Sequence, residues 1–193
     1  MHSNHSSAIR YHFRQPGSRL RGPIRYAIGQ TALGAVLIGH SQPGVCAIFL
    51  DDQACALPPL LRAAFPGTEL REAPQLLRHE MCQILDLLHG KNIEDRLTLD
   101  IGGTAFQQKV WRALCDIPAG QTRSYAQLAA QLGAPQAARA VGSACAANLL
   151  AVAIPCHRVL RHDGSITGYR WGAERKRALL DRELAPRMDP VLS

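Results

Sequence analysis

The sequence predicts a two-part fold, with an α/β domain over residues 22–101 followed by a mainly helical domain over residues 102–187. Three short apolar stretches separated by turn residues predict strands in the first part. Gly102-Gly103 marks a break, and beyond it apolar residues recur at helical spacing. The chain has 193 residues, which is enough for two small domains that each bury a core.

The first domain begins with the three strand-like stretches, at residues 24–28, 34–38 and 45–50. Gly29-Gln30-Thr31 and the turn at residues 41–44 separate them, which is typical of a small antiparallel meander. Further along the chain we expect a helix near 57–65, a second helix over about 74–89 and one more strand at 97–101.

The second domain shows clear helix start signals. Thr104 and Ser124 are suited to cap helices, and Pro135 suits the first turn of a third helix that runs to about Ala147. The helix at 125–132 and this third helix are joined by Gly133-Ala134, which is a helix-turn-helix pattern. A last helix is expected at 173–184.

Residues 1–21 are rich in His, Ser, Arg and Gly and lack a repeating apolar pattern, so we expect a disordered basic tail. We interpret His2, His5 and His12 as solvated residues of this tail and expect no metal there. Residues 188–193 are expected to form a second tail. The chain has no run of 18 apolar residues and its start has no apolar signal core, so we expect a cytoplasmic protein with no membrane partner.

The net charge of +7 is unevenly spread. Residues 1–25 hold five arginines and no acid, residues 26–101 carry a net −4, and residues 102–193 carry a net +6. A basic C-terminal half is compatible with a nucleic-acid partner, although many cytosolic domains are mildly basic.

Six cysteines occur, with no C-x-x-C pair and no zinc spacing, so we expect reduced thiols and no metal site. Cys156 differs from the others because it lies between an apolar stretch and Arg158, and nearby positive charge favours a thiolate. His157 follows directly, and its contact with the thiol requires a turn or a bridging water.

The third helix of the second domain is built almost wholly from small residues. Only Gln136 and Arg139 offer side chains suited to reading base edges, which argues against sequence-specific recognition in the major groove. A slim helix is suited either to close packing against another helix or to binding DNA by shape and backbone, with Arg139 projecting.

Several motifs together resemble the O6-alkylguanine-DNA alkyltransferase family, and its Ada branch most closely. They are Arg139-Ala140-Val141-Gly142, Asn148, Ile154-Pro155-Cys156-His157-Arg158-Val159 and Gly168-Tyr169-Arg170-Trp171-Gly172. The resemblance covers residues 24–185 and is densest from Gly103 onward. It implies a ribonuclease H-like first domain and a winged helix-turn-helix-like second domain.

The resemblance also implies a function, which is DNA repair without turnover and without a cofactor. The methyl group of O6-methylguanine, and of O4-methylthymine, would pass irreversibly to Cys156 after the damaged base is flipped out of double-stranded DNA. We expect no obligate protein partner and a monomer.

By the same resemblance, Glu183 holds His157, which takes the Cys156 proton through a water. Tyr125 stabilises the departing purine, Asn148 fixes the active-site turn, and Arg139 fills the gap left by the flipped base. The remaining implied DNA contacts are Tyr125, Gln136, Ala138, Ala140, Ser143 and Arg158. The carbonyls of Cys156 and Val159 would accept from the guanine amino group, and Tyr169, Arg170 and Trp171 would line or close the pocket.

Two departures from the family matter. Some relatives have Ser-Gly-Gly where this chain has Arg170-Trp171-Gly172, and we expect Trp171 at the pocket mouth to favour methyl over benzyl groups. The zinc module of full-length Ada-type proteins has no counterpart before Ile24, so zinc and transcriptional roles are not carried over.

Two other functions remain open from the sequence. A non-catalytic winged-helix protein that recognises damage without repairing it would need the DNA-binding residues but not Cys156, His157 and Glu183. A cysteine hydrolase would need an oxyanion hole and would leave the slim helix and Arg139 unexplained.

Overall fold

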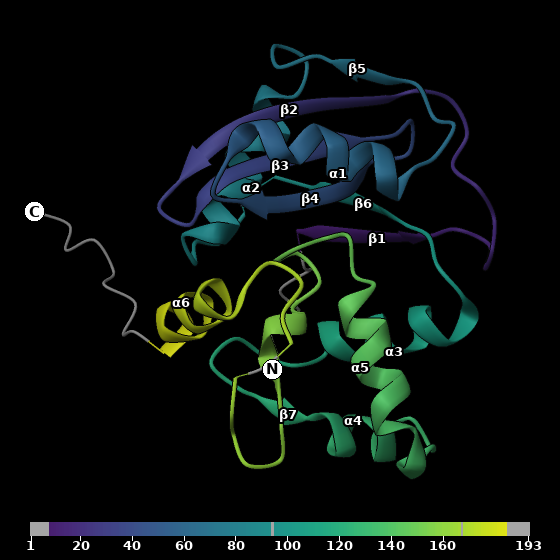
Figure 1. Cartoon of the computed structure of the whole chain (residues 1–193), viewed down its shortest axis with the longest axis vertical. Coiled ribbons are helices and arrows are strands. Elements are labelled where there is room, and N and C mark those ends of the chain that lie inside the picture. The colour runs from purple at the N-terminus through teal and green to yellow at the C-terminus, as the bar shows by residue number, and fades with distance from the viewer. Residues whose placement is uncertain (1–7, 94, 167, 185–193) are drawn as a thin grey trace, which may run out of the picture.

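A computed structural model of the chain describes residues 8–93, 95–166 and 168–184. Figure 1 shows a twisted sheet with its helices in one half of the molecule and a helical half beneath it. The predicted α/β class is therefore confirmed.

The main sheet has six strands in the order β1-β6-β4-β3-β2-β5. The strands are β1 (Ile9–Phe13), β2 (Ile24–Thr31), β3 (Gly34–His40), β4 (Val45–Asp51), β5 (Leu70–Glu72) and β6 (Leu97–Ile101). The pairs β2·β3 and β3·β4 are antiparallel, which confirms the predicted meander. The outer pairs β1·β6 and β2·β5 are parallel, so the meander is the centre of a larger mixed sheet.

The core of this half lies on both faces of β3 and β4, whose inner residues are almost all buried. A short 3₁₀ turn (Ala54–Ala56) leads into helix α1 (Leu57–Ala64), and α2 (Arg78–Leu88) covers the opposite face. Glycines in the strands let both helices approach closely, because a Cβ atom on Gly39 would lie 3.3 Å from Leu61 and one on Gly29 would lie 2.9 Å from Met81. The helix expected at 57–65 is confirmed, whereas the one expected at 74–89 starts only at Arg78.

The expectation of a disordered tail over residues 1–21 is wrong for its described part. Residues 9–13 form β1 and pair with β6 from Leu97 to Ile101. Half-buried Ile9, Tyr11 and Phe13 alternate with exposed Arg10 and His12, which is the period of a strand with one packed face. The first domain therefore begins before residue 22, while residues 1–7 and 188–193 lie outside the described part of the chain.

The second half contains four helices and a two-stranded parallel sheet. They are α3 (Ala105–Cys115), α4 (Tyr125–Gln131), α5 (Ala138–Ala146) and α6 (Ala173–Leu184), with β7 (Arg123–Ser124) beside β8 (Val159–Leu160). The predicted caps are confirmed, since Thr104 with Gln107 and Ser124 with Gln127 each form a reciprocal capping box. A 3₁₀ turn (Pro135–Ala137) precedes α5 as expected from Pro135.

The two halves share a hydrogen-bonded contact at β4. Ile48 donates its backbone amide to Leu149 at 2.8 Å and accepts one from Ala151 at 3.2 Å, so residues 149–151 pair with the edge of β4. Within the described residues, no helix is long and apolar enough to span a bilayer.

Candidate functional site

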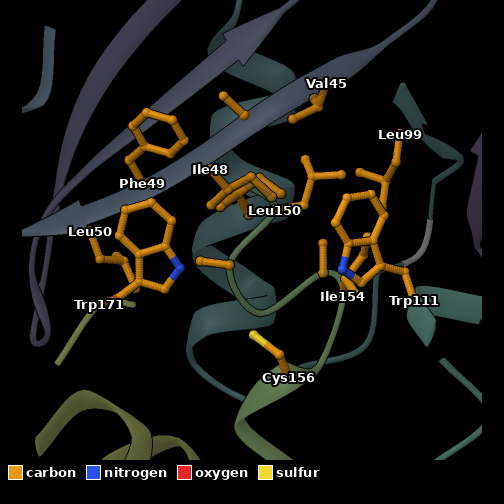
Figure 2. Close-up of a cluster of buried hydrophobic side chains, with 14 of the residues drawn as sticks. Val45, Ile48, Phe49, Leu50, Leu99, Trp111, Leu150, Ile154, Cys156 and Trp171 are labelled. Carbon is orange, nitrogen blue, oxygen red and sulfur yellow. The ribbon is translucent and has the colours of Figure 1, made fainter. Parts of the chain in front are cut away.

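The segment from Asn148 to Pro155 forms a tight turn that delivers Cys156 into the interior. Figure 2 shows Leu150 from this turn beside Ile48 and Ile154 beside Trp111, with the Cys156 sulfur directed toward the same cluster. Cys156 opens a 3₁₀ turn (Cys156–Arg158) and is only 3% exposed. Val152 has φ 59°, a strained value for a β-branched residue that marks how sharply the backbone bends.

Asn148 holds this turn from inside, with bonds to the backbone near Cys156 of the kind that the family resemblance implies. Its amide nitrogen donates to the carbonyl oxygens of Leu150 at 3.3 Å and Ile154 at 3.0 Å, and to the sulfur of Cys156 at 3.1 Å. Its amide oxygen accepts from the backbone nitrogen of Leu150 at 2.9 Å. One buried side chain thus fixes both the backbone of the turn and the position of the thiol.

His157 and Glu183 are in direct contact, with 2.8 Å between Nε2 and Oε1. A carboxylate only accepts, so Nε2 carries the proton and Nδ1 is left as the basic nitrogen. Nδ1 is buried and has no hydrogen-bond partner within the described residues. Burial lowers the pKa of His157 below its ordinary value, so the ring is neutral at pH 7 and can accept a proton.

Arg158 lies where we did not expect it. Its guanidinium binds both carboxylate oxygens of Glu183 at 2.8–3.0 Å and the carbonyl oxygen of Ile117 at 2.6 Å. The expected DNA contact of Arg158 is therefore replaced by an internal ion pair. Burial acts to raise the pKa of Glu183, but the bonds from His157 and Arg158 outweigh it and lower that pKa to about 2.

Lys176 is a further site residue that the sequence analysis missed. It is fully buried, its ammonium group donates to the carbonyl oxygen of Val159 at 2.5 Å, and it lies 6.0 Å from the ring centre of Tyr125. Burial raises the pKa of the Cys156 thiol, whereas the Asn148 amide and the Lys176 charge act to lower it. Burial lowers the pKa of Lys176 itself, while negative charge on Cys156 acts to raise it, so a thiolate at Cys156 and a protonated Lys176 stabilise each other.

Tyr125 opens α4 and is half-buried near the same group. Burial, with smaller effects from Cys145 and Cys156, raises the pKa of its hydroxyl to about 12. The hydroxyl therefore stays protonated at neutral pH and can serve as a hydrogen-bond donor.

Helix α5 presents one face to solvent. Arg139, Ala140 and Ser143 are exposed, Gln136 is exposed just before the helix, and Ala138 is half-buried. Val141, Ala144 and Cys145 are buried on the other face, where the indole nitrogen of Trp111 donates to the carbonyl oxygen of Ala144 at 2.9 Å. The small residues of α5 are therefore compatible with both interpretations of the sequence. Those on one side pack against α3, and those on the other side are exposed to solvent, where DNA could approach.

The loop before α6 brings Tyr169 and Trp171 inside, at 9% and 4% exposure, and leaves Arg170 outside. Trp171 packs against Phe49 of β4, with ring centres 4.9 Å apart, as Figure 2 shows. The expected position of Trp171 at a pocket mouth is therefore wrong.

The two backbone carbonyl groups expected to bind the guanine amino group already have partners within the chain. The carbonyl oxygen of Val159 accepts from Lys176, and that of Cys156 accepts from the backbone amide of Val159.

The thiol is closed off in this structure. A cleft of about 740 Å³ reaches Asn148 and Ile154 but does not include Cys156. Across the described residues, no three His, Cys, Asp or Glu side chains gather in a way that could hold a metal ion.

Comparison with known proteins gives three findings. Residues 105–185 match the family model of the 6-O-methylguanine DNA methyltransferase, DNA binding domain. The chain is 39% identical to the inducible methylated-DNA–protein-cysteine methyltransferase of Bacillus subtilis, over 82% of this chain and 83% of that protein. It is 47% identical to the bifunctional transcriptional activator/DNA repair enzyme Ada of Escherichia coli over 89% of its length, but spans only 48% of that protein.

Solved structures agree with the sequence matches. The crystal structure of Mycobacterium tuberculosis OGT in complex with DNA superposes with a TM-score of 0.71 at 36% identity, covering 83% of this chain and 92% of that one. The O6-methylguanine methyltransferase of the same organism gives a TM-score of 0.70 at 35% identity, over 86% of this chain and 95% of that one.

Proposed function

Since this chain belongs to the methylated-DNA–protein-cysteine methyltransferase family, we propose that it repairs DNA by moving a methyl group from O6-methylguanine to its own Cys156. O4-methylthymine is the second substrate that we propose. The observation that carries this proposal is the setting of the thiol, which accepts from the Asn148 amide and is followed directly in the chain by His157, itself bonded to Glu183.

The proposed step forms one bond and breaks one. The Cys156 sulfur attacks the methyl carbon, a carbon–sulfur bond forms, and the bond between that carbon and guanine O6 breaks with its electrons on oxygen. The thiol proton passes through a water to Nδ1 of His157; the guanine anion then takes a proton from solvent, and His157 returns its own proton to solvent. The product is a thioether, which water does not hydrolyse, so each chain acts once.

Neutral His157 is suited to this role because Glu183 fixes its proton on Nε2. Lys176 stabilises the negative charge that develops on sulfur, and the protonated Tyr125 hydroxyl donates to the departing purine. We propose that the free lone pairs of the Cys156 and Val159 carbonyls bind the guanine amino group. Tyr169 and Arg170 would bound the pocket, with Trp171 behind them.

We further propose that the exposed face of α5 enters the DNA groove. Arg139 would occupy the space of the flipped base, while Gln136, Ala138, Ala140 and Ser143 approach the backbone. In this reading β7 and β8 correspond to the wing of a winged helix-turn-helix-like domain, and the six-stranded sheet corresponds to the ribonuclease H-like domain. The family match at residues 105–185 supports this assignment of the DNA-binding part.

Intact-mass spectrometry tests the proposal directly. The protein is mixed with a duplex that contains one O6-methylguanine, and the expected gain is one methylene mass, about 14 Da, located on Cys156 and stopping at one per chain. Cys156→Ser should show no gain, whereas Cys145→Ser, which removes the other thiol near the site, should still react. No gain on the unaltered chain, with tight binding to the same duplex, would instead favour damage recognition without repair.

A further inference from the structure

Arg175, in the first turn of α6, is bound on three sides by separate segments of the chain. Its Nε donates to the carbonyl oxygen of Leu33 at 2.7 Å, and its Nη1 donates to that of Trp171 at 2.9 Å. Its Nη2 forms an ion pair with the carboxylate of Asp52. Leu33 and Asp52 belong to the connections at the ends of β3 and β4, so this one guanidinium joins the loop beside the thiol to the first domain.

The backbone packs closely around the guanidinium group of Arg175. A Cβ atom on Gly34 would lie 3.1 Å from Nη2 of Arg175, and one on Gly172 would lie 3.5 Å from Nη1. Both glycines have positive φ, 99° and 97°, which other residues rarely adopt. The Arg175 side chain is only 15% exposed, whereas Asp52 is 89% exposed, so the bonds of Arg175 to the carbonyl oxygens of Leu33 and Trp171 are better shielded from water than its ion pair with Asp52.

The loop that Arg175 holds also carries Tyr169, whose pKa is raised by burial and further by Cys156, so this loop lies beside the thiol. Tyr169 and Trp171 point inward from it, and Trp171 is fixed a second time by its packing on Phe49. Cys156 is 3% exposed and Tyr169 is 9% exposed, so this loop has to yield before a base with its alkyl group can reach the sulfur. A methyl group needs a small displacement and a benzyl group needs a large one.

We propose that Arg175 is a specificity-determining positioning residue, which limits the size of the alkyl group by holding the backbone of Trp171 against the first domain. This inference rests on the proposed function, since it concerns the pocket of that same reaction. Arg175 itself touches no reacting atom. It acts by setting how far Tyr169 and its loop can withdraw from Cys156.

The test compares Arg175→Met with a matched change on the same helix. Arg182 also reaches from α6 to the first domain, where it donates to the carbonyl oxygen of Leu88, but its described hydrogen bond does not involve the loop at residues 168–172. Transfer rates are measured by mass spectrometry on two duplexes that differ only in carrying O6-methylguanine or O6-benzylguanine. For Arg175→Met we expect the ratio of benzyl to methyl rates to rise about tenfold, the scale of a pocket contact that discriminates by size.

For Arg182→Met the same ratio should stay at the value of the unaltered chain, even if the domain contact weakens. Arg175→Lys, which keeps the charge but not the three-way donor geometry, should give an intermediate ratio. An unchanged ratio in Arg175→Met, or an equal rise in Arg182→Met, overturns the inference while leaving the proposed function intact.

A second measurement does not depend on transfer activity. Hydrogen exchange of the backbone amides in residues 168–172 should be faster in Arg175→Met than in the unaltered chain, and unchanged in Arg182→Met. Equal exchange in all three proteins refutes the anchoring role of Arg175. Absence of methyl transfer by the unaltered chain would count against the proposed function instead.

Discussion

The side-chain amide of Asn148 donates to the sulfur of Cys156 at 3.1 Å, while its backbone amide bonds the carbonyl oxygen of Cys145 at 3.2 Å. One residue therefore connects the end of α5, the proposed DNA-binding helix, with the reactive thiol. A neutral donor aimed at the sulfur favours the thiolate, which is the form of Cys156 that attacks in the proposed step. The geometry gives Asn148 a structural role, and we propose a chemical one.

Replacing Asn148 by Asp keeps the shape of the side chain and the acceptor for the Leu150 amide, but it removes the donor to sulfur together with the donors to the carbonyl oxygens of Leu150 and Ile154. We expect methyl transfer to slow by about a hundredfold or more, the usual effect of losing one such donor, aggravated by a carboxylate beside the sulfur. The rate is followed by intact mass on a duplex with O6-methylguanine. Asn92→Asp, at an exposed position, is the control, and equal rates for both variants would show that the Asn148 donor is dispensable.

Lys176 is the one cationic side chain fully buried within the described part of the chain, and its charge favours the thiolate of Cys156. In Lys176→Met the thiol pKa should rise, so transfer at pH 7 should fall by about tenfold for each pKa unit and recover partly at higher pH. Lys109→Met changes an exposed lysine of α3 and should react normally.

Stability measurements distinguish this effect from misfolding. Replacing a buried charge by an apolar side chain of similar shape is often neutral for folding, although the carbonyl of Val159 loses its donor. We therefore expect the rate to fall without a matching loss in the urea midpoint. A rate with the same pH profile as the unaltered chain would contradict the electrostatic role.

Glu183 should make the protein sensitive to acid. Its pKa is about 2 in the folded chain, below the ordinary 4.5, so its contribution is present above pH 4.5 and is lost as the pH falls toward 2. The side chain is 11% exposed, and the shift corresponds to about 3 kcal/mol of unfolding free energy. Urea unfolding between pH 6 and pH 3 should show this loss.

In Glu183→Gln the loss over that acid window should be smaller, and the protein should already be less stable at pH 6 because Arg158 is left without its carboxylate. Glu174→Gln, at an exposed position on the same helix, should follow the unaltered chain. If the free energy of unfolding fell with pH in parallel for all three proteins, Glu183 would not be the cause of the acid sensitivity.

The sequence predicted those elements whose signals are local. The turns between β2, β3 and β4, the helix caps at Thr104 and Ser124, and the extent of α6 were all predicted from neighbouring residues. Strand β1 was missed because its stability comes from far along the chain, through its pairing with β6 and the Arg112 guanidinium 3.6 Å from the Phe13 ring centre. No residue close to β1 in the sequence indicates either of these two contacts.

In the candidate site, too, residues with local sequence signals were predicted, and residues whose role depends on distant contacts were missed. Cys156, His157 and Asn148 were predicted from a short segment and its family resemblance, and the structure brings them together with Glu183. Lys176 was missed because it stands among Glu, Arg and Lys residues, which indicate a solvated helix, and only tertiary packing buries it. Arg158 was placed on the DNA because a basic residue in a basic segment gives no sign of its internal partner.

Arg139 provides a test of how the damaged base is extracted. It is exposed on α5, and the described structure records no contact of its guanidinium, so the side chain is free to enter DNA. Arg139→Ala should slow methyl transfer from duplex DNA by about tenfold or more, since nothing then fills the space of the flipped base and unpairing costs a few kcal/mol. Reaction with the free modified base, which needs no flipping, should change little.

Arg139→Lys decides whether charge or insertion matters. If Arg139 only bound a phosphate, Arg139→Lys would react with duplex DNA at the rate of the unaltered chain. Arg139→Ala, which loses the charge, would then mainly show a weaker salt dependence of DNA binding, by about one phosphate contact. If the planar guanidinium fills the base stack, Lys should restore affinity but not the rate. Equal slowing of duplex and free-base reactions in Arg139→Ala would contradict both roles, because the free base contains neither a phosphate nor a base stack.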